Sequence, residues 1–275
     1  MNRKQAGIIA AVGIAAALPL FLAAPSKPGR KKKAPFEHKN FAHRGLHSKD
    51  GSVPENSLAA FRRAAEAGYG VELDVQLSKD GEVVVFHDDT LERVCGVRSG
   101  VDEKTFAELR ALRLNDTDET IPLFTEVLDV YDGRGPMIVE LKSGRRNREL
   151  CEKTLAILKS YSGNYCVESF DPEIVAWFRF HAPNILRGQL AMPWKRYAAS
   201  VPKWLAFAGS RCLCNFMGRP QFIAYDIGRL PLTVRLCHRL GAMNVRWTSH
   251  DIRNEKNADA VIFEFYRPGR NFSNV

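Results

Sequence analysis

The sequence predicts an α/β protein, a TIM-type (β/α)₈ barrel preceded by one N-terminal transmembrane helix. Eight short runs rich in β-branched and aromatic residues alternate with stretches of helical periodicity. No glycine-rich nucleotide-binding loop follows any of these runs, which argues against an open doubly wound sheet. A chain of 275 residues suits one barrel of about 250 residues with a short extension.

The N-terminal extension is the predicted membrane anchor. Residues 6–24 carry no charged side chain, and 19 residues at about 1.5 Å each nearly cover a hydrocarbon core of about 30 Å. A cleaved secretory signal peptide is the alternative, because the run ends in the small residues Ala23 and Ala24. The run is long for a signal peptide, so we expect a retained single-pass helix and localisation at a membrane.

A basic linker follows the anchor and ends at residue 35, before a catalytic domain of residues 36–275. Its Lys and Arg side chains between residues 27 and 33 outweigh Arg3 and Lys4, so the positive-inside tendency favours a cytoplasmic catalytic domain. The same linker is expected to contact anionic membrane lipid. Residues 1–33 hold seven basic side chains and no acid, which leaves 33 basic against 31 acidic residues elsewhere. A body so close to neutral argues against nucleic acid as a partner.

The six cysteines are spread along the chain without the spacing of a disulfide framework. This distribution predicts free thiols, as is usual in a reducing compartment. Cys212 and Cys214 lie too close in sequence for common zinc spacing, so we expect them to be small core residues.

The strands and helices of the barrel follow from the periodicity of the apolar residues. The expected strands are residues 40–43, 71–76, 137–142, 165–168, 186–190, 222–226, 243–247 and 260–264, and outer helices are expected at 57–67, 147–161 and 172–181. An additional strand, 82–87, departs from strict alternation. If Asp80-Gly81 is its two-residue hairpin turn, facing residue numbers sum to about 161, which places His87 opposite Asp74.

Carboxylates gather at the ends of two predicted strands. Glu72 and Asp74 lie two residues apart and therefore share one side, as do Glu140 and Lys142. In a (β/α)₈ barrel the C-terminal strand ends converge on the active-site mouth. Each acid alone would more often be an ordinary exposed residue, but the combination predicts oxygen ligands for Ca²⁺ or Mg²⁺.

Phosphate-binding and acid–base residues accompany these carboxylates. His43 and Arg44 end the first strand, and a guanidinium binds phosphate bidentately. With His87, the chain offers two imidazoles that could act as base and acid in the transfer of a metal-bound phosphodiester. Asn56 or Ser57 is a plausible N-cap of the next helix, which leaves the preceding Glu55 unexplained.

These residues fall into a series of short motifs. They are His43-Arg44-Gly45, Pro54-Glu55-Asn56-Ser57, Glu72-x-Asp74, Phe86-His87-Asp88, Ile121-Pro122 before Glu126-Val127-Leu128, Glu140-x-Lys142, Ser169-Phe170 and Trp247-Thr248. The ordered set, which covers roughly residues 40–268, resembles the signatures of the glycerophosphodiester phosphodiesterase family. The resemblance implies a TIM barrel that hydrolyses glycerophosphodiesters to an alcohol and sn-glycerol 3-phosphate with a divalent metal ion.

The resemblance also implies a role for each motif residue. It makes Glu72, Asp74 and Glu140 metal ligands, His43 and His87 the acid and base, and Arg44 and Lys142 phosphate contacts. We place Trp247 with the substrate-binding residues, and Glu55 and Asn56 with the supporting residues. One position departs from the family pattern: Glu264 stands where Asp before a proline turn is usual, which weakens any role assigned to it.

Two other functions stay open at this point. The first is a phospholipase D-type activity on lysophospholipids by the same chemistry, and the second is a catalytically silent lipid-binding barrel. The segment from Trp194 to Arg219 is rich in apolar residues. It is expected either to pack in the outer helical layer or to form a surface that enters a membrane near the active-site mouth.

Overall fold

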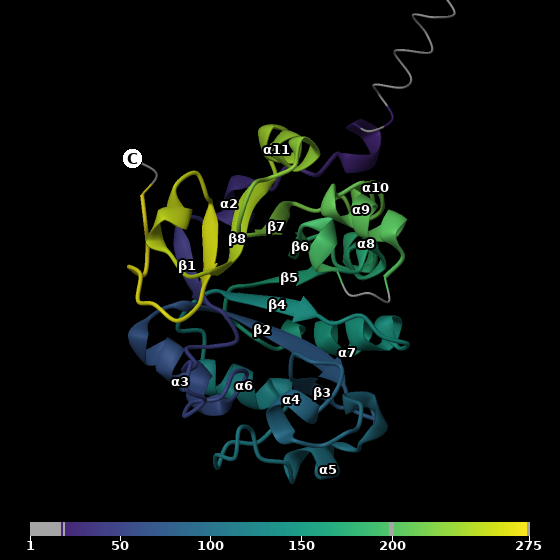
Figure 1. The fold of residues 1–275 in the computed structure, drawn as a ribbon. Coiled ribbons are helices and arrows are strands. Elements are labelled where there is room, and N and C mark those ends of the chain that lie inside the picture. The colour runs from purple at the N-terminus through teal and green to yellow at the C-terminus, as the bar shows by residue number, and fades with distance from the viewer. Residues whose placement is uncertain (1–17, 19, 198–200, 274–275) are drawn as a thin grey trace, which may run out of the picture.

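A computed structural model describes residues 18, 20–197 and 201–273, and these form a closed barrel (Figure 1). The strands are β1 (Lys39–Ala42), β2 (Gly70–Leu77), β3 (Val83–Val85), β4 (Met137–Leu141), β5 (Tyr165–Ser169), β6 (Leu186–Ala191), β7 (Phe222–Asp226), β8 (Met243–Ser249) and β9 (Ala260–Phe263). Every strand of the barrel pairs in parallel with its neighbours, and β1 closes it by pairing with both β2 and β9. The predicted (β/α)₈ barrel is therefore confirmed, and each of its eight predicted strands overlaps an observed one.

Helices cover the outside of the barrel. The α-helices are α2 (Arg30–Lys33), α3 (Leu58–Ala67), α4 (Glu92–Cys95), α5 (Phe106–Arg110), α6 (Phe124–Tyr131), α7 (Asn147–Lys159), α8 (Pro172–His181), α9 (Lys203–Ser210), α10 (Asn215–Gly218) and α11 (Leu232–Arg239), with 3₁₀ turns η1 (Val101–Glu103), η2 (Trp194–Arg196) and η3 (Ile252–Glu255). The α3 helix shows how the sequence sets these bounds. The Ser57 hydroxyl accepts from the Ala60 amide at its start, and Gly68 ends it with a left-handed φ of 73°.

Side chains alternate along each strand between the barrel interior and the helical layer. Phe41 of β1 and Phe222 of β7 belong to one interior cluster, which also includes Phe36. The intervening strand residues, such as Val139 of β4, pack against the surrounding helices. Because this alternation continues to the C-terminal strand ends, the last inward residues point into the barrel mouth.

The β2–β3 hairpin corrects the predicted pairing of His87. Val75 pairs with Val85, so facing residue numbers sum to 160 and not to about 161. The turn uses three residues between Ser78 and Glu82, the last being Gly81 with a φ of 84°. The Asp74 carbonyl therefore accepts from the Phe86 amide, and His87 lies beyond the end of β3.

The predicted membrane localisation is also corrected. No helix in the part of the chain that the structure describes is both long and apolar enough to cross a bilayer. Residues 6–17 and 19 of the predicted span lie outside the described residues. The described helical turn ends at Ala23, which is buried against the barrel, where the Asn215 side-chain amide donates to its carbonyl at 2.9 Å. The single-pass topology and the cytoplasmic placement drawn from it are therefore not retained.

The predicted linker is partly structured. The Ser26 amide donates to the Pro220 carbonyl at 2.9 Å, residues 30–33 form α2, and Phe36 joins the interior cluster. All six cysteines are free thiols, as predicted, and Cys212 is a buried core residue.

Candidate active site

The predicted site residues meet in one cavity at the C-terminal ends of the strands. It has a volume of about 270 Å³. Its lining side chains come from nearly every strand end around the mouth: His43, Arg44, Glu72, His87, Glu140, Glu168, Phe170, Leu190, Met192, Trp247 and Ile262. One half of this lining is charged and the other half is mainly apolar, so the cavity offers different surfaces to the two ends of a ligand.

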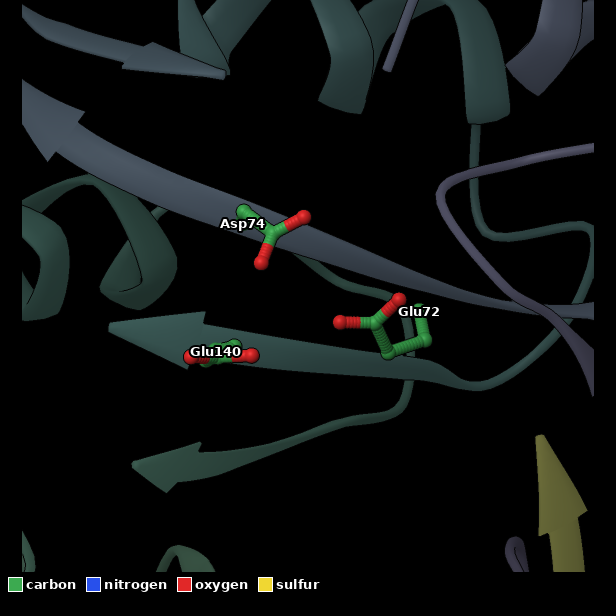
Figure 2. A group of neighbouring side chains, drawn as sticks. All are labelled: Glu72, Asp74 and Glu140. Carbon is green, nitrogen blue, oxygen red and sulfur yellow. The ribbon is translucent and has the colours of Figure 1, made fainter. Parts of the chain in front are cut away.

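Three carboxylates form the centre of the charged half. Figure 2 shows Glu72 and Asp74 of β2 beside Glu140 of the adjacent strand β4. Asp74 and Glu140 are paired in the register, and one ligand oxygen from each of the three residues lies within 4.8 Å of the others. All three are buried. Clustered, inward-facing carboxylate oxygens are the donors that Ca²⁺ and Mg²⁺ prefer, so the residues fit a hard divalent ion.

Cations and an amide compensate part of this charge. Lys142 Nζ lies 2.9 Å from Glu140 Oε1 and 3.4 Å from Asp74 Oδ1. Arg44 Nε lies 3.7 Å from Asp74 Oδ2, to which Asn56 Nδ2 also donates at 2.8 Å. Asp74 is thus the carboxylate with the most partners in this cluster.

The three carboxyl groups respond differently to burial. Burial would raise the pKa of Asp74, but His87, Lys142 and Arg44 hold it well below its usual range. Burial and the neighbouring carboxylates raise the pKa of Glu72 well above its usual range. Burial also raises the pKa of Glu140, although Lys142 opposes this. The cluster therefore holds more acid than its protein cations compensate, and a divalent ion would remove the imbalance.

His43 and Arg44 reach the mouth from the turn that follows β1. Arg44 has a φ of 53° and Gly45 a φ of 77°, and any Cβ at position 45 would lie only 2.9 Å from the Ala60 side chain. Only glycine fits position 45 without strain, which is the local reason for the His-Arg-Gly sequence. The turn also allows the Arg44 amide to donate to Glu72 Oε2 at 3.1 Å.

Glu264, whose role the sequence left in doubt, holds His43 in place. His43 Nδ1 lies 3.2 Å from Glu264 Oε1, and His43 Nε2 lies 3.9 Å from Glu72 Oε2. Burial, and then Arg44, lower the pKa of His43 to about 4, although Glu264 opposes the shift. His43 is therefore a neutral imidazole at pH 7, and its bond to a carboxylate favours the tautomer with the proton on Nδ1.

Two further imidazoles bind the same carboxylate. His47 Nε2 lies 3.1 Å from Glu264 Oε1, and His250 Nε2 lies 3.0 Å from Glu264 Oε2. Burial would raise the pKa of Glu264, but the bonds to these imidazoles and to His43 hold it far below its usual range. Neither His47 nor His250 was singled out in the sequence, because the loops that bring them together carry no local signal.

His87 is the second predicted acid–base residue and lies at the open side of the mouth. Its Nδ1 is 2.6 Å from Asp88 Oδ1, and Asp88 Oδ2 accepts from Arg93 Nε at 2.5 Å. Glu55 accepts from Arg93 at 2.6 Å and from Arg44 at 2.8 Å. Glu55, which no local motif explained, therefore connects the two arginines that flank the mouth.

Asn56 and Ser57 divide the two tasks that the sequence left open between them. Ser57 is the N-cap of α3, since its hydroxyl accepts from the Ala60 amide. Asn56 has a left-handed φ of 54° and is free to hydrogen bond Asp74. Its placement as a supporting residue fits this contact.

The apolar half of the cavity is built around Trp247. Its indole Nε1 donates to the Ala191 and Ala224 carbonyls at 3.2 Å, and Phe170 packs edge-on with ring centroids 5.8 Å apart. The indole N–H is already bonded, so the ring face is the part that Trp247 can offer to a ligand. The predicted substrate-binding position of Trp247 thus lies across the cavity from the carboxylates.

Glu168 is a buried acid in the cavity that was not predicted from the sequence. It is paired in the register with Glu140 and lines the cavity, although it ended a predicted strand just as Glu140 did. Burial, with Glu140 and Asp74, raises its pKa well above the usual range. The signal that could have found it was the alternation along 165–168, which turns residue 168 inward.

Comparisons with known proteins agree with this geometry. A family model described as the glycerophosphoryl diester phosphodiesterase family matches residues 43–260. A glycerophosphodiester phosphodiesterase of Caldanaerobacter subterraneus subsp. tengcongensis is 41% identical over 111 residues, which are 38% of this chain and 44% of that protein. Lysophospholipase D GDPD1 of Homo sapiens is 31% identical over 156 residues, which are 52% of this chain and 48% of that protein. The chain thus aligns with less than half of the length of each of these two relatives.

A solved structure shares the fold. The chain is similar to a phosphodiesterase of Oleispira antarctica in complex with the product sn-glycerol 3-phosphate, with a TM-score of 0.66 and 23% identity. The match covers 82% of this chain and 93% of the other. At this identity the similarity supports the fold alone.

Proposed function

Because the chain belongs to the glycerophosphoryl diester phosphodiesterase family, we propose that its barrel mouth hydrolyses a glycerophosphodiester to an alcohol and sn-glycerol 3-phosphate through Glu72, Asp74 and Glu140. The observation that carries the proposal is the meeting of these carboxylates with two histidines and two cations in one cavity. Glu72, Asp74 and Glu140 would hold a divalent ion such as Ca²⁺ or Mg²⁺, which when bound supplies Lewis-acid polarisation of a phosphoryl oxygen.

Arg44 and Lys142 would bind the phosphodiester beside this cluster. Both cations lie within 4 Å of Asp74, so the carboxylate positions them as well as balancing them. An arginine fork and a lysine ammonium together can contact the two non-bridging oxygens of a diester. The phosphate would thus lie over the strand ends of β2 and β4.

His43 and His87 would move the protons. With Nδ1–H donated to Glu264, His43 keeps a free lone pair on Nε2, so it can take the proton from an attacking water. His87 lies on the opposite, more open side and is held through Nδ1 by Asp88, so it can donate a proton to the leaving alcohol. The two imidazoles would therefore act as base and acid.

The proposal is tested by measuring sn-glycerol 3-phosphate release from a panel of glycerophosphodiesters, with and without a chelator. We expect hydrolysis that the chelator removes and added divalent ion restores. Asp74→Asn should lose this activity, whereas Glu173→Gln, which changes an exposed carboxylate in α8, should keep it. No release from any diester, or full activity in Asp74→Asn, would contradict the proposal.

A lysophospholipid is a second candidate substrate, favoured by exposed apolar side chains beside the mouth. Trp194 of η2 follows β6, and Trp204 and Phe207 of α9 are 70% and 46% exposed. These side chains could hold the acyl chain of a substrate whose headgroup enters the cavity. Faster turnover of a long-chain lysophospholipid than of its soluble headgroup diester, with the difference lost in Trp204→Glu, would support it. Contact of the basic segment 27–33 with membrane lipid stays a prediction.

A further inference from the structure

Glu168 is the one carboxyl group of the cavity that lacks a hydrogen-bond partner among the described residues. It is 2% exposed, and its Oε2 is enclosed without any donor. The neighbouring acids are different: Glu140 contacts Lys142 at 2.9 Å, and Glu72 accepts from the Arg44 amide at 3.1 Å. A buried polar group without a partner costs stability, so its presence on a cavity wall points to a partner that arrives with a ligand.

The position of Glu168 separates it from the proposed phosphate-binding residues. It lines the cavity next to Phe170 and Leu190, in the apolar half that Trp247 and Ile262 complete. Ile262 is 1% and Leu190 4% exposed, so this half is enclosed, whereas His87 on the other side keeps 30% of its side chain exposed. The enclosed half therefore suits the constant part of a substrate, and the open side suits a variable leaving alcohol.

The enclosed half has the surface that a short polyol needs. Apolar walls can contact the C–H bonds of the polyol, and one unpartnered carboxyl group can bond a hydroxyl. The volume of the whole cavity, about 270 Å³, lies just below the usual range of about 300 to 1,000 Å³ for ligand sites, so the occupant is small. A carboxyl group accepts a hydrogen bond from a hydroxyl in either protonation state, so this recognition does not depend on its charge.

We propose that Glu168 is a specificity-determining residue that hydrogen-bonds a free hydroxyl of the glycerol moiety, with Trp247 and Phe170 enclosing its carbon atoms. This inference rests on the proposed function, since that function supplies the glycerol. It assigns the selection of glycerophosphodiesters over other diesters to one side chain of β5. Sites built to bond a hydroxyl reject analogues that lack it more strongly than apolar pockets reject a change in size.

The test compares the binding of two monoesters to Glu168→Met, Glu168→Gln and the wild-type protein by calorimetry. The ligands are sn-glycerol 3-phosphate and methyl phosphate, which carries the same phosphate without a hydroxyl. We expect Glu168→Met to weaken the first ligand at least about 10-fold and the second less than about 2-fold. Glu168→Gln, whose amide can bond the hydroxyl, should stay within about 3-fold of the wild type for both. Glu173→Met in α8 removes an exposed carboxylate and serves as the matched control.

Two further measurements separate this role from others. A structural role predicts that Glu168→Met lowers the thermal unfolding midpoint, whereas the present proposal predicts an unchanged or higher midpoint, because an unpartnered buried carboxyl group is removed. A metal-ligand role predicts weaker Mn²⁺ binding in Glu168→Met, and we expect Mn²⁺ affinity within about 2-fold of the wild type.

Each outcome decides the proposal. Equal affinity of Glu168→Met and the wild type for sn-glycerol 3-phosphate overturns it, as does a loss in Glu168→Gln as large as in Glu168→Met. Weakened Mn²⁺ binding overturns it in favour of a fourth ligand. If the wild-type protein hydrolyses no glycerophosphodiester, the proposed function fails, while the binding of the two monoesters still decides whether Glu168 recognises the hydroxyl.

Discussion

Lys142→Met tests whether the carboxylate cluster depends on its protein cation when no metal ion is bound. The ammonium lies 2.9 Å from Glu140 Oε1 and 3.4 Å from Asp74 Oδ1, and only 14% of the side chain is exposed. Methionine keeps most of the volume of the side chain and removes the charge. The variant should therefore fold with the same barrel but with two carboxyl groups that have lost their shared cation.

The size of the effect has an upper bound set by proton uptake. At an effective dielectric constant of about 20, each of the two contacts is worth about 5 kcal/mol before the cost of burying the ammonium. A carboxylate that loses its partner can instead take up a proton, which at pH 7 costs about 3.5 kcal/mol for a group with an ordinary pKa of about 4.3. We therefore expect Lys142→Met to lower the free energy of unfolding by about 2 to 4 kcal/mol at pH 7.

The pH dependence gives the sign. In the variant the pKa of the affected carboxyl group is raised above its unfolded value, so the folded state binds more protons than the unfolded state. Its penalty is then present above about pH 4.3 and grows with pH until the raised pKa is passed. The difference between Lys142→Met and the wild type should therefore be smaller at pH 5 than at pH 7.

Urea unfolding in the presence of a chelator, at pH 5 and pH 7, measures both quantities. Lys159→Met, at the exposed end of α7, is the matched control and should cost less than about 1 kcal/mol. Adding saturating Ca²⁺ or Mg²⁺ at pH 7 should stabilise Lys142→Met at least as much as the wild type. A loss below about 1 kcal/mol at pH 7, or the same loss at both pH values, would refute this account of the cluster.

Metal binding, proton transfer and charge pairing at the mouth can each be tested by substitution. Asp74→Asn should weaken binding of a divalent ion at least about 100-fold by calorimetry, and unchanged affinity would remove Asp74 from the ligand set. His43→Ala and His87→Ala should each lower kcat by about 10²- to 10⁴-fold, and a 4-nitrophenyl diester should restore only His87→Ala; equal recovery of both would reverse or dismiss the assignment. Glu55, whose pKa Arg93 and Arg44 lower to about 2 against the opposing effect of burial, should contribute on the order of 2 kcal/mol above about pH 4.3 that is lost toward pH 2. An acid-unfolding difference between Glu55→Gln and the wild type that does not shrink below pH 4 would contradict it.

Strand periodicity predicts the part of the site that lies on strands. Glu72, Asp74 and Glu140 follow from alternation alone, because inward residues at the C-terminal ends of parallel strands must face the same mouth. The same rule reaches Glu168, which ends the next strand and was passed over. What alternation does not contain is a count of turn residues, so the hairpin before β3 was assigned one residue too few.

The loops and the N-terminus were beyond such a rule. Glu264 bonds three imidazoles from two different loops, and nothing local to any of them indicates the others. An uncharged N-terminal run predicts a membrane span when only its hydropathy is considered. Hydropathy does not include tertiary contacts, and the burial of Ala23 beneath Asn215 is such a contact.

The charges at the mouth also explain why a divalent ion and a phosphodiester suit each other here. Glu55 is compensated by Arg93, and Glu264 by its imidazoles, so the balance rests on the residues in contact with the triad. Three ionised carboxylates face two permanent cations, Lys142 and Arg44, which leaves one uncompensated negative charge. A divalent ion changes this to one net positive charge, equal and opposite to the single negative charge of a phosphodiester. A phosphomonoester dianion would overcompensate it, so the cluster favours the diester in the ground state and the release of a more highly charged product after hydrolysis.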